Sequence, residues 1–204
     1  MSDFAASRLH LHLHLHLEAQ LFYPYEASGT SLFAVLDGAR DRAVGRALSA
    51  HTVEYQSLFS GPLSWSLRAA SPLIVKLVPG EDFTKQLIAE GWGRAWGIYL
   101  ASSSTLLGVR RHLRTLLRVR LDDGRKCYFR YYDPRVLRAF LPTCTPEQLR
   151  QIFGPITRFD LEDSDSSTLL RFRLSPGPVS ALRAWRHDLK ATTAPVTRDA
   201  WATT

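Results

Sequence analysis

The chain has 204 residues, 45% of them hydrophobic, which suits one well-filled core and leaves too little sequence for two comfortable domains. Its 26 Lys and Arg residues exceed its 19 Asp and Glu residues, and this excess favours an acidic partner such as nucleic acid, an anionic membrane surface or an acidic protein. The sequence contains neither a signal-peptide core nor an apolar run of about 18 residues, so we expect a soluble, cytoplasmic protein.

The chain opens on an unusual segment, LHLHLHLHL at residues 9–17, in which histidine alternates with leucine. In an extended strand the four histidines would share one face at a spacing of about 7 Å, a geometry that can hold a divalent metal. Simple alternation supplies neither mixed ligands nor supporting hydrogen-bond partners for a metal. We therefore interpret residues 1–20 as a low-complexity leader whose leucines cover an apolar edge, and we expect no metal.

Strand-like and helix-like runs alternate after this leader. Short apolar runs predict strands, at residues 31–39, 53–59, 72–77 and 96–102. Amphipathic runs with acidic or serine starts predict helices, at residues 39–51, 81–92 and 103–116. The order predicts a mixed α/β (α+β) fold, a single domain in which helices flank a central sheet. We place this domain at residues 21–157, followed by a short extension at 158–204.

A β-hairpin that leads into a helix is predicted in the middle of the chain. Residues 117–121 and 125–132 flank an Asp-Asp-Gly triplet, whose glycine accommodates the positive backbone angles of a tight turn. Alternation along the second strand predicts one buried face and one face that offers Arg130 and Tyr132.

The Asp133-Pro134 pair ends this hairpin and predicts the start of a helix. Aspartate is a good N-cap and proline is favoured at the first helical position. Arg130 leaves two alternatives open, because a guanidinium beside a carboxylate can be a structural pair or an anchor for a carboxylate of a partner.

These segments, in this order, resemble the effector-chaperone and adaptor family of bacterial type VI secretion systems. The resemblance runs from Leu32 to Ile156 and is most specific in the helix, hairpin and FRYYDPRVL sequence. It implies a noncatalytic protein that binds a cognate toxin effector, often its N-terminal region, and helps load it onto a VgrG-type spike. Positions that match the family pattern are Asp37, Trp96, Gly97, His112, Arg130, Tyr132, Asp133, Pro134, Phe153 and Gly154.

Our candidate contacts with a protein partner are the strand-to-helix junction and the basic helix. The junction comprises Arg130, Tyr132 and Asp133, and the helix contributes Arg110 and Arg114, which we expect on a solvated face. Many relatives have a longer region after the shared domain. Here residues 159–174 predict only a hairpin, and the segment from residue 179 begins with an amphipathic helix pattern.

Enzymatic function finds little support in the sequence. Nucleotide-binding, zinc-protease and hydrolase motifs are absent, and the two cysteines, Cys127 and Cys144, have no spacing typical of a zinc site or a disulfide framework. An acidic cluster at residues 160–165 lacks the spacing of a calcium loop and predicts a solvated loop. We expect neither cofactor nor catalysis, with His112 a partly buried structural residue.

Nucleic-acid binding is the alternative from another class. The arginines of residues 110–120 are dense enough to meet phosphates, and Tyr128, Arg130 and Tyr132 suggest a stacking platform for bases. No recognisable nucleic-acid motif accompanies this charge. Salt separates the alternatives, since binding through phosphates weakens steeply as salt rises and binding through apolar surface weakens much less.

Overall fold

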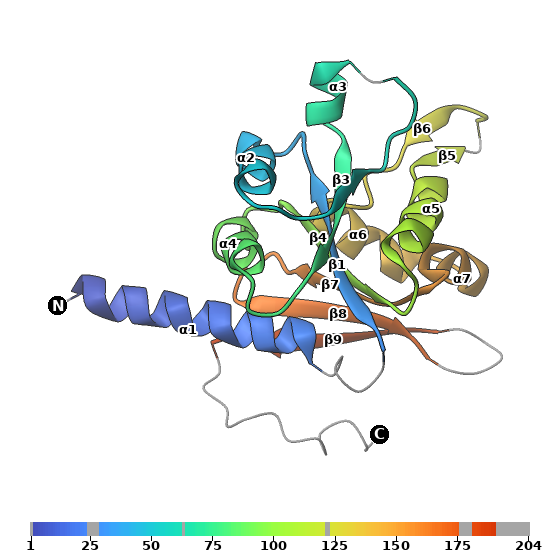
Figure 1. Ribbon diagram of the computed structural model, residues 1–204. Helices are drawn as coiled ribbons and strands as arrows, with labels where there is room; N and C mark the ends of the chain where they lie inside the picture. The colour runs from blue at the N-terminus through green and yellow to red at the C-terminus, as the bar shows by residue number, and fades with distance from the viewer. Residues whose placement is uncertain (1, 24–28, 63, 121–122, 176–180, 191–204) are drawn as a thin grey trace.

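The computed structural model describes residues 2–23, 29–62, 64–120, 123–175 and 181–190. In this part of the chain, helices cover both faces of a seven-stranded antiparallel sheet (Figure 1), which confirms the predicted mixed α/β domain. The strand order is β2-β3-β1-β4-β7-β8-β9. The strands are β1 (Ser31–Asp37), β2 (Tyr55–Ser57), β3 (Pro72–Leu77), β4 (Gly97–Ser102), β7 (Ile156–Glu162), β8 (Thr168–Leu174) and β9 (Leu182–Asp188).

Each face of the sheet has its own apolar core. One core lies beneath α1 (Ser2–Phe22), α2 (Arg42–Ala50) and α4 (Asp82–Gly91). The other lies beneath α5 (Leu106–Leu116), α6 (Pro134–Phe140), the short η2 turn (Leu141–Thr143) and α7 (Pro146–Phe153). The central strand β1 is buried on both sides, with Phe33 and Val35 in the second core and Leu32, Ala34 and Leu36 in the first, because successive side chains of a strand point to opposite faces.

The short helix α3 (Trp65–Ala69) was not predicted from the sequence. It lies between β2 and β3 in the chain and begins at Ser64, whose hydroxyl caps the helix by accepting a hydrogen bond from the Leu67 amide. None of its residues is buried. Because the segment contributes nothing to the core, no apolar periodicity marks it in the sequence.

The predicted hairpin forms a separate two-stranded sheet, β5 (Arg118–Arg120) with β6 (Lys126–Tyr128), although Asp122 of its turn lies outside the described residues. The predicted alternation fails beyond Tyr128, because Tyr131 and Tyr132 are both buried, at 1% and 6% exposure. Strand pairing ends there, and the amide of Asp133 donates to the carbonyl of Arg130 in a turn. The side chains of 131 and 132 therefore no longer follow the period of a strand.

The His/Leu segment is helical, so the extended arrangement considered for its histidines is not found. Leu13, Leu17 and Leu21 recur every four residues on the sheet-facing side of α1, and the last two are fully buried. In a helix, residues two positions apart point in different directions, and alternation therefore does not gather the histidines on one face. His16 contacts the carbonyl oxygen of Leu189 at 3.3 Å.

The C-terminal residues continue the main sheet as β7, β8 and β9. The predicted hairpin at residues 159–174 is confirmed as β7 and β8. The amphipathic helix predicted from residue 179 is wrong, because β9 pairs with β8 from Leu182 to Asp188, although residues 179 and 180 lie outside the described ranges. Cross-strand pairing along β8 outweighs the local helical pattern, since tertiary context commonly overrides propensity.

The prediction of a solvated acidic loop is also wrong for most of its residues. Asp160, Glu162 and Asp163 are buried, and Asp165 alone of the four acidic residues is exposed. Asp160 and Glu162 belong to β7 itself, where neighbouring strands and basic side chains surround them.

A fully buried charge cluster anchors α1 to the sheet. Asp160 on β7 lies between two arginines, with its carboxylate oxygens 2.7 Å from Nε of Arg158 and 2.8 Å from Nε of Arg171. The same guanidinium groups donate to the last carbonyls of α1, from Arg158 to Leu21 at 2.6 Å and from Arg171 to Gln20 at 2.7 Å. Carbonyl groups at a helix C-terminus lack helical partners and carry partial negative charge. The cluster therefore gives these carbonyls hydrogen-bond donors, and the carbonyls supplement the single carboxylate that the two arginines share.

We predict that Asp160→Asn destabilises the protein by about 3–5 kcal/mol, because removing one partner leaves two buried guanidinium groups without a compensating charge. Urea unfolding followed by circular dichroism measures the loss. The matched control is Asp82→Asn, which removes an exposed carboxylate from a pair with Lys85 and from the first turn of α4, and should lower the free energy of unfolding by about 1 kcal/mol or less. Equal midpoints for the Asp160→Asn variant and the wild type would contradict this account of the cluster.

Candidate protein-binding corner

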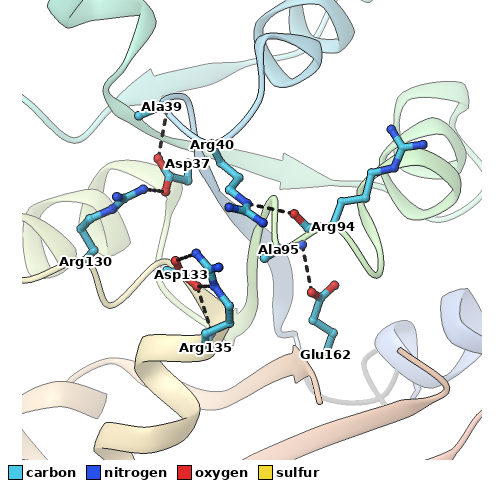
Figure 2. A network of polar contacts seen from close by, with 9 residues as sticks. All are labelled: Asp37, Ala39, Arg40, Arg94, Ala95, Arg130, Asp133, Arg135 and Glu162. Atoms are coloured by element: carbon cyan, nitrogen blue, oxygen red, sulfur yellow. Dashed lines mark hydrogen bonds and ion pairs between the residues drawn. The ribbon is translucent and has the colours of Figure 1, made fainter. Parts of the chain in front are cut away.

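Three segments that are distant in sequence meet at one end of the central strands. They are residues 37–41 at the end of β1, residues 92–96 before β4 and residues 130–135 at the start of α6, and we call this meeting point the corner (Figure 2). Gly97 permits the close approach, since a Cβ atom at this position would overlap the carbonyl oxygen of Val35. The family position Gly97 is therefore explained by packing of β4 against β1.

Asp37 ties all three segments of the corner together. Its side chain is 1% exposed, and its backbone amide donates to the carbonyl of Trp96 at 2.7 Å. Its carboxylate accepts from the amide of Ala39 at 3.1 Å and forms an ion pair with Arg130 (Figure 2). The hydrogen bond to Asp37 raises the pKa of Arg130, whose side chain remains 47% exposed. Asp37 therefore has a structural role in this pair, whereas the guanidinium of Arg130 remains accessible to a partner.

Trp96 supports the corner from the buried side. Its ring is 1% exposed, and its indole N–H donates to the carboxylate of Asp41 at 3.3 Å. Asp41 also caps α2, where it accepts from the amide of Ala43. The family position Trp96 therefore joins the turn after β1 to the loop before β4.

Asp133 has the N-cap role predicted for it. Its carboxylate accepts from the backbone amide of Arg135 at 3.0 Å and from the guanidinium of the same residue at 2.6 and 2.9 Å. Burial by itself would raise the pKa of Asp133, but the hydrogen bonds from Arg135 lower it below its ordinary value. Pro134 follows at the start of α6, which confirms the predicted helix start.

Glu162 is part of the corner that sequence reasoning missed. From the end of β7 its carboxylate accepts from the amides of Gly93 and Ala95, which fixes the loop before β4. Burial raises the pKa of Glu162 above its ordinary value, against the effect of these hydrogen bonds. Ala95 has a φ of 55°, a strained backbone for alanine, and the hydrogen bond to Glu162 holds it there. A long-range contact of this kind leaves no local sequence pattern.

The corner exposes guanidinium groups and buries carboxylates. Arg40 and Arg94 are exposed, and Nε of Arg40 donates to the carbonyl of Arg94 at 3.2 Å. Arg130 and Arg135 are about half exposed, at 47% and 52% of their side chains. Four positive groups therefore face outward from a frame of buried acids, which favours a partner with a complementary negative surface.

The sequence-predicted contacts divide between two places. Arg130, Tyr132 and Asp133 lie together at the corner, but the ring of Tyr132 is buried and packs edge-on against Tyr131, so it supports the corner from beneath. Arg110 does not lie on a solvated face as predicted: it is partly buried and donates to the carbonyl of Ser57 at 2.7 Å. Arg114 is partly exposed on the same helix.

A second group of family positions gathers at α5 and α7. Nε2 of His112 lies 2.9 Å from the carbonyl oxygen of Ile152, and Phe153 packs edge-on against Phe159 in the core. Gly154 ends α7 with a φ of 48°, and a Cβ atom there would overlap the ring of His112. The contact supports a structural role for His112, and it explains why a glycine suits position 154.

Two further features of the described residues bear on the site. No helix in the described ranges is long and apolar enough to cross a membrane. Within the same ranges, no group of three or more His, Cys, Asp or Glu side chains is placed to hold a metal ion.

We predict that Gly154→Ala lowers the free energy of unfolding by about 1–3 kcal/mol through backbone strain. Overlap of the new methyl group with the His112 ring should add to this loss. Gly124→Ala is the matched control, since Gly124 also has a positive φ, of 82°, but open space around it. Thermal unfolding should rank Gly154→Ala as the less stable variant. Adding His112→Ala to Gly154→Ala should cost less than the two single losses combined. Equal losses for the two glycine variants and strict additivity would contradict the packing argument.

Comparison of the sequence with known protein families gives a match. Residues 32–151, more than half of the chain, match the family described as "Domain of unknown function (DUF4123)". The match includes every family position named above except Phe153 and Gly154. No curated protein and no solved structure is detectably similar to the chain. This family is known in adaptors of type VI secretion effectors. The chain belongs to the DUF4123 family.

Proposed function

We propose that the protein is a noncatalytic adaptor chaperone of the cytoplasm, which binds a cognate type VI toxin effector and helps load it onto a VgrG-type spike. The observation that carries this proposal is the family match over residues 32–151, which contains all three segments of the corner. Glu162, which contacts the corner through Ala95, lies outside the matched residues. The partner surface is the corner. The adaptor holds the N-terminal region of the effector in a form that the spike can accept.

The rigidity of the corner supports a binding role. Asp37, Asp133 and Glu162 hold three loops in place through hydrogen bonds to backbone amides and to arginine side chains. A surface that is already ordered loses little conformational entropy when a partner binds, so more of the contact energy appears as affinity. The outward guanidinium groups add electrostatic steering and selectivity for acidic partners.

The chemistry of the corner favours binding over catalysis. A general base needs a carboxylate or imidazole that can exchange protons with a substrate. The lowered pKa of Asp133 keeps this carboxylate ionised, and its oxygens accept hydrogen bonds from Arg135. The carboxylate of Asp37 accepts from Ala39 and Arg130 in the same way. Both acids therefore have structural partners where a catalytic acid would face a substrate.

The nucleic-acid alternative loses part of its basis. The predicted stacking platform needed Tyr128, Arg130 and Tyr132 on one open face, but only Tyr128, at 63% exposure, has an exposed ring, because Tyr132 is buried. Arg118 already lies over the ring of Tyr128, 5.7 Å from its centroid. We therefore treat retention of nucleic acid as an outcome that would count against the adaptor proposal.

We predict that co-expression with proteins encoded beside this chain captures one toxin-like neighbour, and that capture survives high salt because exposed apolar side chains next to the corner, such as Trp65, contribute to it. Arg94→Glu reverses an exposed charge at the corner, and Arg130→Gln removes a charge while it keeps a donor for Asp37. Each should reduce the affinity for the neighbour by about tenfold or more. Pull-down yield and titration of the purified neighbour measure the effect.

Arg111→Glu is the matched control, since it reverses an exposed charge on α5 away from the contacts of the corner. It should capture the neighbour as well as the wild type does. Circular dichroism confirms that each variant is folded. The proposal fails if no neighbour is captured, or if the chain instead retains nucleic acid that high salt removes.

A further inference from the structure

A pocket of about 1110 Å³ opens between α2, β2 and α3. Gly38, the residue after Asp37, is one of its lining residues, so the pocket adjoins the corner. Apolar side chains form part of its lining, among them Leu48 from α2, Leu73 from β3 and Phe59 from the chain after β2. A concave site with an apolar lining is the usual shape of a site that receives a side chain from a partner.

The wall of this pocket displays large apolar side chains to solvent. Trp65 on α3 is 84% exposed and lines the pocket, whereas Leu67, 53% exposed on the same helix, lies outside the lining. Tyr55 at the edge strand β2 is 43% exposed. The helix α3 stands off from the sheet at one end of the molecule (Figure 1) and buries none of its own residues. Exposed aromatic residues gathered beside a pocket are typical of protein-binding sites.

The charge of the pocket is entirely positive. Its described lining residues include four arginines and no Asp or Glu. Arg42, Arg46 and Arg68 form no ion pair within the described part of the chain. Unpaired arginines around an apolar centre complement carboxylates, which they can bind through two parallel hydrogen bonds.

Arg110, the fourth arginine, disfavours the addition of a partner strand at this surface. β2 is an edge strand, which could in principle pair with an added strand from a partner. The amide of Leu58 donates to Pro72 of β3, so by alternation the carbonyl of Ser57 points away from β3. Arg110 occupies this outward carbonyl at 2.7 Å. Side chains, and not an added strand, are therefore the groups that the pocket is built to receive.

We propose that this pocket binds an acidic segment of a partner protein, with an aromatic or aliphatic side chain inserted among Leu48, Leu73 and Trp65 and carboxylates on Arg42, Arg46 and Arg68. The inference rests on the proposed adaptor function for its biological partner. A nucleic acid fits this pocket less well, because the polar edges of a base would lose water against the leucine side chains without hydrogen-bond partners.

Selection from a display library of short random peptides on the purified chain tests the chemistry without a known partner. Enriched peptides should carry Trp, Phe or Leu within a few positions of Asp or Glu. Synthetic copies of the enriched peptides, labelled with fluorescein, are then titrated by fluorescence anisotropy. A labelled single-stranded DNA oligonucleotide serves as the comparison probe.

Arg46→Glu with Arg68→Glu should weaken peptide binding by about tenfold or more, since carboxylates of the peptide would then face like charges. Trp65→Ala should weaken it while leaving stability unchanged, because that side chain is exposed. Arg111→Glu, outside the pocket, is the charge-matched control and should bind as the wild type does. Enrichment of basic or purely polar peptides, peptide binding that these variants do not change, or DNA binding stronger than peptide binding would overturn the proposal.

The neighbour protein of the co-expression experiment separates failure of the pocket from failure of the adaptor function. Capture that the pocket variants reduce supports both proposals. Equal capture by the wild type and the pocket variants overturns the pocket while the adaptor function stands. Absence of capture overturns the adaptor function, and the peptide titrations then decide the pocket alone.

Discussion

The buried carboxylate of Asp37 is the constraint on which the corner depends. It stands at the end of β1, the strand that pairs with both β3 and β4 near the middle of the sheet. A buried carboxylate is costly unless it is paired and hydrogen-bonded, and Arg130 and Ala39 meet this need from different segments. The requirement brings the residues before α6 to the end of β1 and fixes the guanidinium of Arg130 at the surface.

Two clusters in this fold combine arginine with buried aspartate but serve different ends. Arg158 and Arg171 are themselves buried, and their guanidinium groups pair with Asp160 and with the carbonyls at the end of α1, out of reach of a partner. At the corner, by contrast, the acids are buried and Arg130 and Arg135 are about half exposed. The first cluster therefore holds a helix to the sheet, and the second presents positive charge to a partner.

Local patterns made much of the fold predictable. The strand at β1, the hairpin turn and the cap at Asp133 each follow from residue types within a few positions. Features that depend on distant contacts were missed or misread. The sequence of β9 has a helical pattern, but the strand pairs with β8. Glu162 was predicted in a solvated loop, but its carboxylate is buried against the amides of Gly93 and Ala95. Tyr132 was expected on an open face because nothing local reports the turn that buries it.

The most direct test of the partner surface is hydrogen exchange, measured on the chain alone and in complex with the neighbour protein that it captures. Exchange at a surface slows when a partner covers it or stabilises it against local opening. The account predicts slower exchange in the complex at residues 38–41 and 93–95 of the corner and at α3, with α7 unchanged. Slower exchange confined to α7 or to the far edge strand β9 would contradict the placement of the partner at the corner.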